Sequence, residues 1–283
     1  MIGIIGGSGL YEIEGFEDVS EREVDTPYGK PSDPLVMGSL MGQDVVFLAR
    51  HGRGHRYLPT EINYRANIYA LKAAGVTRIF SVSAVGSMRE ELVPGQVAVI
   101  DQFFDHTRHR GSTFFGDGVV GHVALGHPIC GAVANVLADG ADDAGATVHR
   151  GGTYLCMEGP QFSTVAESKI YRTWGVDVIG MTNVTEAKLA REAGMCYATL
   201  AMLTDYDCWH PDHDHVTTEM VIEVLLQNVK LSKEIIKKAL ARIDQVGECG
   251  CADAAKNAVL TARDRITPEM RERLQVLFGS ALD

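Results

Sequence analysis

The sequence has no apolar run of ~18 or more residues, the length that a helix needs to cross a bilayer. It is also poor in positive charge, because 26 Lys and Arg residues stand against 37 Asp and Glu residues and give a net charge of −11. Nucleic-acid-binding surfaces are normally basic. The N-terminus begins with an apolar strand and carries no basic leader of the secretory kind. We therefore expect a cytoplasmic protein whose partners are neither membranes nor nucleic acids.

The six cysteines match neither a zinc ribbon nor a thioredoxin motif in their spacing. Cys130, Cys156 and Cys196 lie among apolar residues, where cysteine is most simply a small core residue. Cys249 and Cys251 lie in a polar segment and could form a redox pair or a disulfide to the body of the protein. Intracellular disulfides are unusual outside hyperthermophiles. We interpret this pair as a stability feature without a catalytic role.

Apolar runs alternate with amphipathic segments that end at glycine, a common helix stop signal. This pattern predicts an α/β fold in which helices flank a mixed and largely buried central sheet. Strands are expected at 1–5, 45–49, 78–82, 96–101, 153–157, 176–180 and 196–203, and helices at 63–74, 128–144, 162–174, 185–192, 217–243 and 268–278. We find no repeat and no linker, so we expect one domain over residues 1–283, with a C-terminal helical extension from about residue 247.

Two carboxylates, Asp205 and Asp207, directly follow the apolar run 196–203. A core cannot hide them without partners, because an unpaired buried charge is very costly. Ligands bind at the carboxyl ends of strands in open α/β sheets. The spacing of two can place both carboxylates on one side of an extended segment. This pattern predicts a functional site, and a solvated acidic loop is the alternative.

Small and polar residues also follow four other predicted strands. Gly6 to Gly9 would let backbone N–H groups approach an anion closely, and Arg50 offers a planar fork for phosphate. The local alternatives are a tight turn and a surface arginine beside a satisfied histidine. Together these strand ends would form a phosphate pocket without metal, made of Ser8, Arg50, His51, Ser83, Ala84 and Thr182.

Seven segments carry a family pattern: 3–10 (GIIGGSGL), 25–33 (DTPYGKPSD), 48–53 (LARHGR), 86–91 (GSMREE), 101–103 (DQF), 158–163 (EGPQFS) and 204–209 (TDYDCW). As a set they resemble the trimeric purine nucleoside phosphorylases, and among these the 5′-methylthioadenosine phosphorylases. The resemblance implies a pentosyltransferase of purine and methionine salvage with a purine nucleoside phosphorylase-like fold. It would convert methylthioadenosine and phosphate to adenine and 5-methylthioribose-1-phosphate. It implies no cofactor beyond the co-substrate phosphate, no metal, and a homotrimer or a dimer of trimers.

The resemblance also implies a role for each motif residue. The six residues of the phosphate pocket would hold phosphate, Phe162 and Ser163 would face the base, and Met181 would face the ribose. Asp205 and Asp207 would face the purine N7 and 6-amino edge. An acid that protonates N7 as the glycosidic bond breaks can contribute ~10²–10⁴-fold to the rate. Burial or a like charge nearby can keep a carboxylic acid protonated at neutral pH.

The methylthio group needs an apolar slot, and the resemblance implies that His122 of a neighbouring subunit helps to form it. An exposed loop histidine is the alternative interpretation of His122. Thr218 departs from the apolar residue usual at its position and could admit adenosine as well. The lining of the slot would be completed by Val216, Thr218 and Val221.

Two other functions stay open. A 6-oxopurine nucleoside phosphorylase would act on inosine, guanosine or methylthioinosine, but that branch has Asn at the position of Asp205 and Glu at that of Ser163. A non-catalytic nucleoside-binding protein would have no need of both Arg50 and Asp205. The histidines and aspartates of 210–215 could suggest a metal, but we interpret them as a polar loop over the pocket.

Overall fold

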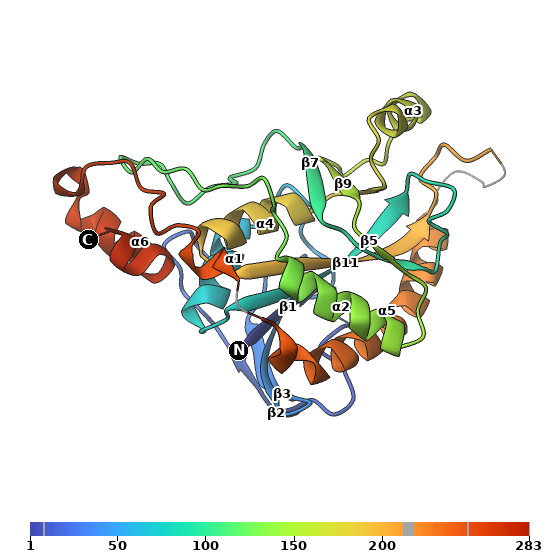
Figure 1. Cartoon of the computed structure of the whole chain (residues 1–283), viewed down its shortest axis with the longest axis horizontal. Coiled ribbons are helices and arrows are strands. Elements are labelled where there is room, and N and C mark those ends of the chain that lie inside the picture. Colours follow the sequence, from blue (N-terminus) through green and yellow to red (C-terminus); the bar gives the residue numbers. More distant parts are fainter. Residues whose placement is uncertain (8, 212–217, 248, 283) are drawn as a thin grey trace.

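The computed structural model describes residues 1–7, 9–211, 218–247 and 249–282, and it contains one mixed sheet flanked by helices (Figure 1). The predicted α/β fold is therefore confirmed. The main path of the sheet runs β2-β3-β4-β1-β5-β10-β9-β7; β11 pairs with β5 and β6, and β6 pairs with β8. The strands are β1 (Ile2–Gly6), β2 (Glu17–Arg22), β3 (Leu35–Leu40), β4 (Gln43–Ala49), β5 (Arg78–Ser87), β6 (Val97–Val99), β7 (Gln102–His106), β8 (Val148–Arg150), β9 (Thr153–Met157), β10 (Val178–Gly180) and β11 (Cys196–Asp205).

The centre of the sheet is parallel and buried. β5 pairs in parallel with both β1 and β11, and all five residues of β1 are buried. Such strands are covered by helices on both faces, which explains their continuous apolar runs. The edge strand β2 is exposed along its whole length, so its sequence has no apolar run, and the sequence did not predict it.

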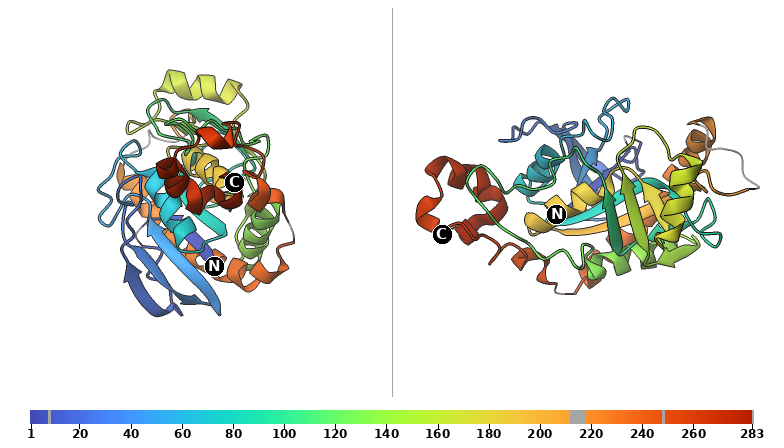
Figure 2. Two further views of the ribbon diagram at one scale, coloured as in Figure 1. Left: turned by 90° about the vertical axis from the view of Figure 1, so that its left-hand side faces the viewer. Right: turned by 90° about the horizontal axis from the view of Figure 1, so that it is seen from above.

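Helices cover both faces of the sheet (Figures 1 and 2). α2 (Gly131–Asp143) packs against α5 (Thr218–Ala241), and α1 (Tyr64–Ala73) packs against α4 (Asn183–Glu192). The short α3 (Val165–Thr173) stands above β9. Within the residues described, no helix combines the length and the apolar character needed to cross a bilayer.

The chain after α5 consists of short helical pieces joined by turns. They are η1 (Ile243–Gln245), η2 (Gly250–Asp253), η3 (Arg263–Arg265), α6 (Pro268–Phe278) and η4 (Gly279–Leu282). α6 packs against α1, and the backbone around Val259 pairs with Gly121. The C-terminal pieces thus rest on two segments that lie far from them in the sequence.

Two predicted boundaries were wrong in ways that affect the site. The helix expected at 162–174 begins at Val165, because Thr164 and Glu167 form a capping box at its N-terminus. The strand expected at 78–82 continues to Ser87, because its last residues pair with β10. Phe162 and Ser163 therefore lie in a loop before α3, and Ser83 and Ala84 lie within β5 instead of after it.

Candidate functional site

The carboxyl end of β11 lies beside the end of β5, where the pairing register shifts between Leu203 and Asp205. After the shift, Asp205 lies opposite Gly86. A Cβ atom at position 86 would lie 2.9 Å from Asp205 Oδ1, which is closer than real Cβ contacts allow. The absence of a side chain at Gly86 therefore leaves the space that the Asp205 carboxylate occupies.

Asp205 and Asp207 are joined through a tight local turn. The Thr204 hydroxyl donates to Asp205 Oδ2 at 2.6 Å, and the Asp207 backbone N–H donates to Asp205 Oδ1 at 2.7 Å. Asp207 has φ of 52°, in the left-handed region. The prediction that both carboxylates lie along one extended segment is therefore wrong, because only Asp205 belongs to the strand and the chain turns before Asp207.

The Asp207 side chain is buried, and burial is the largest cause of a raised pKa for its carboxyl group. The neighbouring charge of Asp205 acts in the same direction, whereas the nearby hydroxyls of Ser168 and Ser163 lower the pKa. The direction agrees with the requirement for a carboxyl group that retains its proton near neutral pH.

The loop before α3 approaches this turn. The Cys208 thiol donates to the Ser163 carbonyl oxygen at 3.3 Å, so Ser163 lies beside the carboxylates. Phe162 is half exposed. Met181 lies against Gly159, where an added Cβ would be 2.6 Å from the Met181 sulfur. The structure therefore brings the loop, Met181 and the turn at Asp207 to one edge of the sheet.

Arg50 follows β4 and is buried in an ion pair with Glu186 of α4. Its Nε donates to one carboxylate oxygen at 2.5 Å, and Nη2 donates to the other at 3.1 Å. Burial alone would lower the pKa of Arg50, but the Glu186 carboxylate raises it above the usual value. The guanidinium of Arg50, which was expected to face a ligand, is thus paired with the carboxylate of Glu186, a residue that the sequence analysis did not identify.

Further donors of Arg50 bind two residues of β5. Nη2 donates to Ser81 Oγ at 2.6 Å, and Nη1 donates to the Val82 carbonyl oxygen at 2.8 Å. Arg50 has five N–H groups in total. Among the residues that the structure describes, these contacts leave one hydrogen on Nη1 for another acceptor.

His51 keeps a neutral ring. Burial is the main cause that lowers its pKa to about 4, and the charge of Arg50 adds to the effect. Its Nδ1 lies 2.8 Å from the Tyr57 carbonyl oxygen. A carbonyl can only accept, so the neutral ring carries its hydrogen on Nδ1 and leaves Nε2 as an acceptor.

The structure describes three further residues that were predicted to bind phosphate: Ser83, Ala84 and Thr182. Ser83 Oγ lies 3.4 Å from the Tyr154 hydroxyl, Ala84 is exposed, and Thr182 is buried as the N-cap residue of α4. The next residue, Asn183, donates to Ser81 Oγ at 2.9 Å, which ties the start of α4 to the same network. Ser8 lies outside the described residues.

Arg110 is a central residue of the site that sequence reasoning missed. Its side chain is 1% exposed and pairs with Glu158 at 3.1 Å. It also donates to the carbonyl oxygens of Glu158, at 2.8 Å, and Met181, at 2.5 Å. Arg110 therefore joins the loop before α3 to Met181. It belongs to a segment without periodicity, and nothing in the run Arg108-His109-Arg110 distinguishes it from a solvated basic loop.

Of the predicted methylthio residues, only His122 has a side chain within the described part of the chain. His122 is exposed, and its backbone N–H donates to the Ala258 carbonyl oxygen at 2.9 Å, on the C-terminal segment. A pocket of about 470 Å³ beside it is lined by residues of 112–125 and by Lys188 and Glu192 of α4. Val216 lies outside the described residues, as do the side chains of Thr218 and Val221 in α5.

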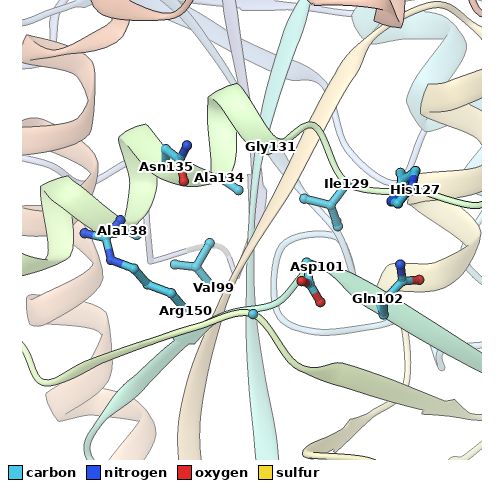
Figure 3. Close-up of a pocket in the computed structure, with 11 residues that line it drawn as sticks. Val99, Asp101, Gln102, His127, Ile129, Gly131, Ala134, Asn135, Ala138 and Arg150 are labelled. Carbon is cyan, nitrogen blue, oxygen red and sulfur yellow. The ribbon is translucent and has the colours of Figure 1, made fainter.

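Another pocket, of about 490 Å³, lies away from the carboxylates (Figure 3). Asn135 and Ala138 of α2 line one side of it, opposite Val99 of β6 and Arg150 of β8. None of the residues predicted for the site lines this pocket. It therefore adds nothing to the constellation at the ends of β5 and β11.

The sequence matches known proteins over nearly its whole length. The model of the phosphorylase superfamily matches residues 1–241. An S-methyl-5′-thioadenosine phosphorylase of Geobacter sulfurreducens is 57% identical over 281 residues, which cover 99% of this chain and 98% of the relative. One of Koribacter versatilis is 55% identical, over 98% of this chain and 95% of the relative.

Solved structures agree in fold. A methylthioadenosine phosphorylase from an antarctic soil metagenomic library superposes with a TM-score of 0.93 at 47% identity, covering 98% of both chains. A methylthioadenosine phosphorylase of Schistosoma mansoni, in complex with adenine, gives 0.84 at 39% identity over 89% of this chain and 95% of its own. The likeness extends over almost the full length of the chain.

Proposed function

Because the chain belongs to the S-methyl-5′-thioadenosine phosphorylase family of the phosphorylase superfamily, we propose that it cleaves methylthioadenosine with phosphate to adenine and 5-methylthioribose-1-phosphate. The observation that carries this proposal is the place of Asp207, which is buried beside Asp205 at the end of β11, where burial raises the pKa of its carboxyl group. A purine leaves poorly as an anion, and a protonated carboxyl group at this place can deliver a proton to N7.

Asp205 supplies the complementary acceptor for the base. Its two oxygens are oriented by Thr204 and by the backbone of Asp207, so the carboxylate cannot rotate freely. A carboxylate accepts from a 6-amino group and repels a 6-oxo group, which is itself an acceptor. Ser163 lies beside Asp205 at the position where the 6-oxo branch carries Glu, and its smaller side chain leaves more room next to the base. This pair of residues therefore favours adenine over hypoxanthine.

Phosphate would lie between Arg50, His51 and the start of α4. Arg50 would give it one Nη1 hydrogen, and a helix N-terminus favours an anion there. The free Nε2 of His51 would accept the P–OH hydrogen of hydrogen phosphate, since Nδ1 holds the ring hydrogen. We assign the remaining contacts to Ser8, Ser83, Ala84 and Thr182.

The glycosidic bond would lie between phosphate, on the ribose side, and Asp207, on the purine side, so both products are stabilised as the bond breaks. Positive charge develops on the ribose as the base leaves, and the phosphate anion stabilises it before attacking the anomeric carbon. Phe162 would cover the base and Met181 the ribose. The choice of ligand has support from a similar protein, because the Schistosoma mansoni methylthioadenosine phosphorylase was solved with adenine and, as a variant, with methylthioadenosine.

We propose a homotrimer, or a dimer of trimers, in which each subunit lends His122 to its neighbour. The exposed position of His122, away from the carboxylates of its own chain, supports this assignment. Val216, Thr218 and Val221 would complete the methylthio slot. The molar mass in solution, measured by light scattering, tests the assembly separately from the reaction.

The decisive assay measures free base released from methylthioadenosine, adenosine, methylthioinosine and inosine, each with and without phosphate. We expect phosphate-dependent adenine release that is fastest from methylthioadenosine. Preference for the two 6-oxo nucleosides would contradict the base assignment. Tight binding of all four without turnover would instead indicate a nucleoside-binding protein.

Substitution of Asp205 tests how the base is recognised. Asp205→Asn keeps a side-chain oxygen but adds an amide donor, so 6-amino nucleosides should lose about 1–3 kcal/mol of transition-state binding while 6-oxo nucleosides gain relative activity. The ratio of kcat/KM for methylthioadenosine and methylthioinosine measures this change. An unchanged ratio would remove Asp205 from the base edge.

A further inference from the structure

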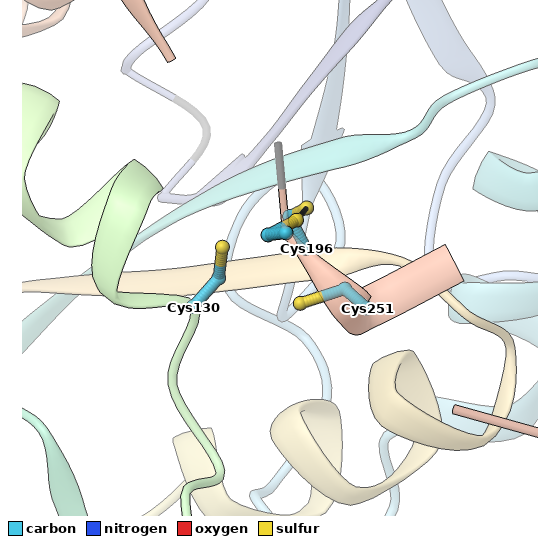
Figure 4. A group of neighbouring side chains, drawn as sticks. Cys130, Cys196 and Cys251 are labelled. Carbon is cyan, nitrogen blue, oxygen red and sulfur yellow. Dashed lines mark hydrogen bonds between the residues drawn. The ribbon is translucent and has the colours of Figure 1, made fainter. Parts of the chain in front are cut away.

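Four cysteines from three separate parts of the sequence meet at one point of the fold (Figure 4). They are Cys130, Cys196, Cys249 and Cys251, and their sulfur atoms all lie within 4.8 Å of one another. Cys130 precedes α2, Cys196 begins β11, and the other two flank Gly250 in the C-terminal segment. In Figure 4 the Cys130, Cys196 and Cys251 side chains come from three separate segments and lie around one common space.

The spacing of the sulfurs fits one tetrahedral metal ion. Four thiolates at ~2.3 Å from a central Zn²⁺ are about 3.8 Å from one another. The sulfur atoms of the cluster, which all lie within 4.8 Å of one another and are 3.2 Å apart for Cys196 and Cys249, have spacings compatible with that value. A two-iron cluster divides its thiolates between two irons and so needs a wider arrangement.

The surroundings of the cluster also suit a metal site in which four thiolates leave a net negative charge around the bound cation. Arg191 of α4 donates to the Cys251 sulfur at 3.6 Å, and such donors outside the coordination sphere orient and stabilise ligands. Cys130 lies at the N-terminal end of α2, where the helix dipole favours a thiolate. Cys130, Cys196 and Cys251 are buried and Cys249 is exposed, which gives the ion a path from solvent.

We infer that these four cysteines bind one structural Zn²⁺ in a closed tetrathiolate site. Soft thiolate ligands select zinc, and a complete set of four leaves no open position for catalysis. The ion would fasten the extension expected from about residue 247 to α2 and β11. Two of its ligands lie beyond residue 241, where the match to the family model ends, and none of the four is assigned to the reaction, so the site does not depend on the proposed reaction.

Metal content of the full-length protein tests this inference. The protein is produced with zinc in the medium, purified without chelators, and analysed by elemental mass spectrometry. We expect about one zinc per chain in the wild type, and loss of that zinc in Cys249→Ser and in Cys251→Ser. The matched control is Cys156→Ala, a buried cysteine outside the cluster that contacts Arg110, and it should retain its zinc.

A second measurement uses only the wild-type chain, so it does not depend on the folding of the variants. After zinc is removed with a chelator under reducing conditions, Co²⁺ is added; tetrahedral thiolate coordination gives strong visible absorption that zinc then abolishes. Failure to bind either ion, one iron per chain in place of zinc, or two disulfides found by intact mass would each overturn the zinc site. A chain that lacks zinc but still phosphorolyses nucleosides would overturn this inference alone.

Discussion

Arg50 and Asp207 are both buried near the ends of central strands, yet the protein holds them in different ways. Arg50 is fixed by Glu186, which lies 136 residues further along the chain and neutralises its charge. Asp207 is fixed by a turn whose main contact is with Asp205, two residues earlier, and this contact adds a like charge. One side of the site is a permanently charged pair, and the other is a carboxyl group that can change its protonation state.

This difference suits the two halves of the proposed reaction. An anion-binding site works best when its cation is always charged and already oriented, so that no reorganisation is needed when phosphate arrives. A proton donor must instead give up its proton and recover it in each cycle, which requires a pKa nearer the working pH. Each prediction below changes one of the two regions and leaves the other intact.

The largest effect is expected at the proton donor. Asp207→Asn keeps the shape of the side chain but cannot release a proton to N7, so kcat for methylthioadenosine should fall by ~10²–10⁴-fold with little change in the KM for phosphate. Steady-state kinetics with phosphate varied at saturating methylthioadenosine measures both values. Asp44→Asn, at an exposed carboxylate of β4, is the control and should keep wild-type kcat. A similar kcat in the two variants would mean that Asp207 is not the acid.

In the other region, the comparable change is Glu186→Ala. It leaves the buried guanidinium of Arg50 without its partner, and breaking a buried pair in this way costs about 3–5 kcal/mol of folding free energy. Urea unfolding measures the change. The control is Glu23→Ala, which breaks an exposed pair with Lys30 and should cost less than about 1 kcal/mol. Equal losses in the two variants would show that burial of the Arg50 pair has no special importance.

The same comparison explains what the sequence could predict. The apolar run before Asp205 and the polar residues after it are local signals, so the strand and the carboxylates were found from the sequence alone. The partner of Arg50 lies inside a predicted helix, where Glu186 has the composition of any helical residue. Only the folded chain, in which α4 packs against β11 and its Glu186 meets Arg50, reveals this partner.

Other features stayed hidden for the same physical reason. Arg110 lies in an irregular segment, and its role comes from carbonyl groups of two distant loops. β2 is fully exposed and lacks the apolar alternation by which strands are recognised. The four-cysteine cluster joins three separate parts of the chain, and pairwise spacing in the sequence contains no trace of it.

The smallest predicted effect concerns His51, beside the Arg50 pair. Its pKa is about 4 in the folded chain and near 6.5 when unfolded, so only the unfolded chain takes up a proton between these values. Folding stability should therefore fall as the pH is lowered from 6.5 to 4, by about 2 kcal/mol from this residue after allowance for partial exposure. His51→Asn removes the titrating ring but can still donate to the Tyr57 carbonyl, so its stability should decline less over this range.

The comparison between wild type and variant isolates this residue, because the other titrating groups are shared and their contributions cancel. Unfolding should be followed in a buffer without phosphate, since an anion that binds the folded site would stabilise it and could restore the proton to His51. His149→Gln is the matched control, as its ring contacts Gln96 outside the site. If both variants follow the wild-type pH profile, His51 is protonated as readily in the folded chain as in the unfolded one. Below about pH 6.5 its Nε2 would then carry a hydrogen and could not accept one from phosphate.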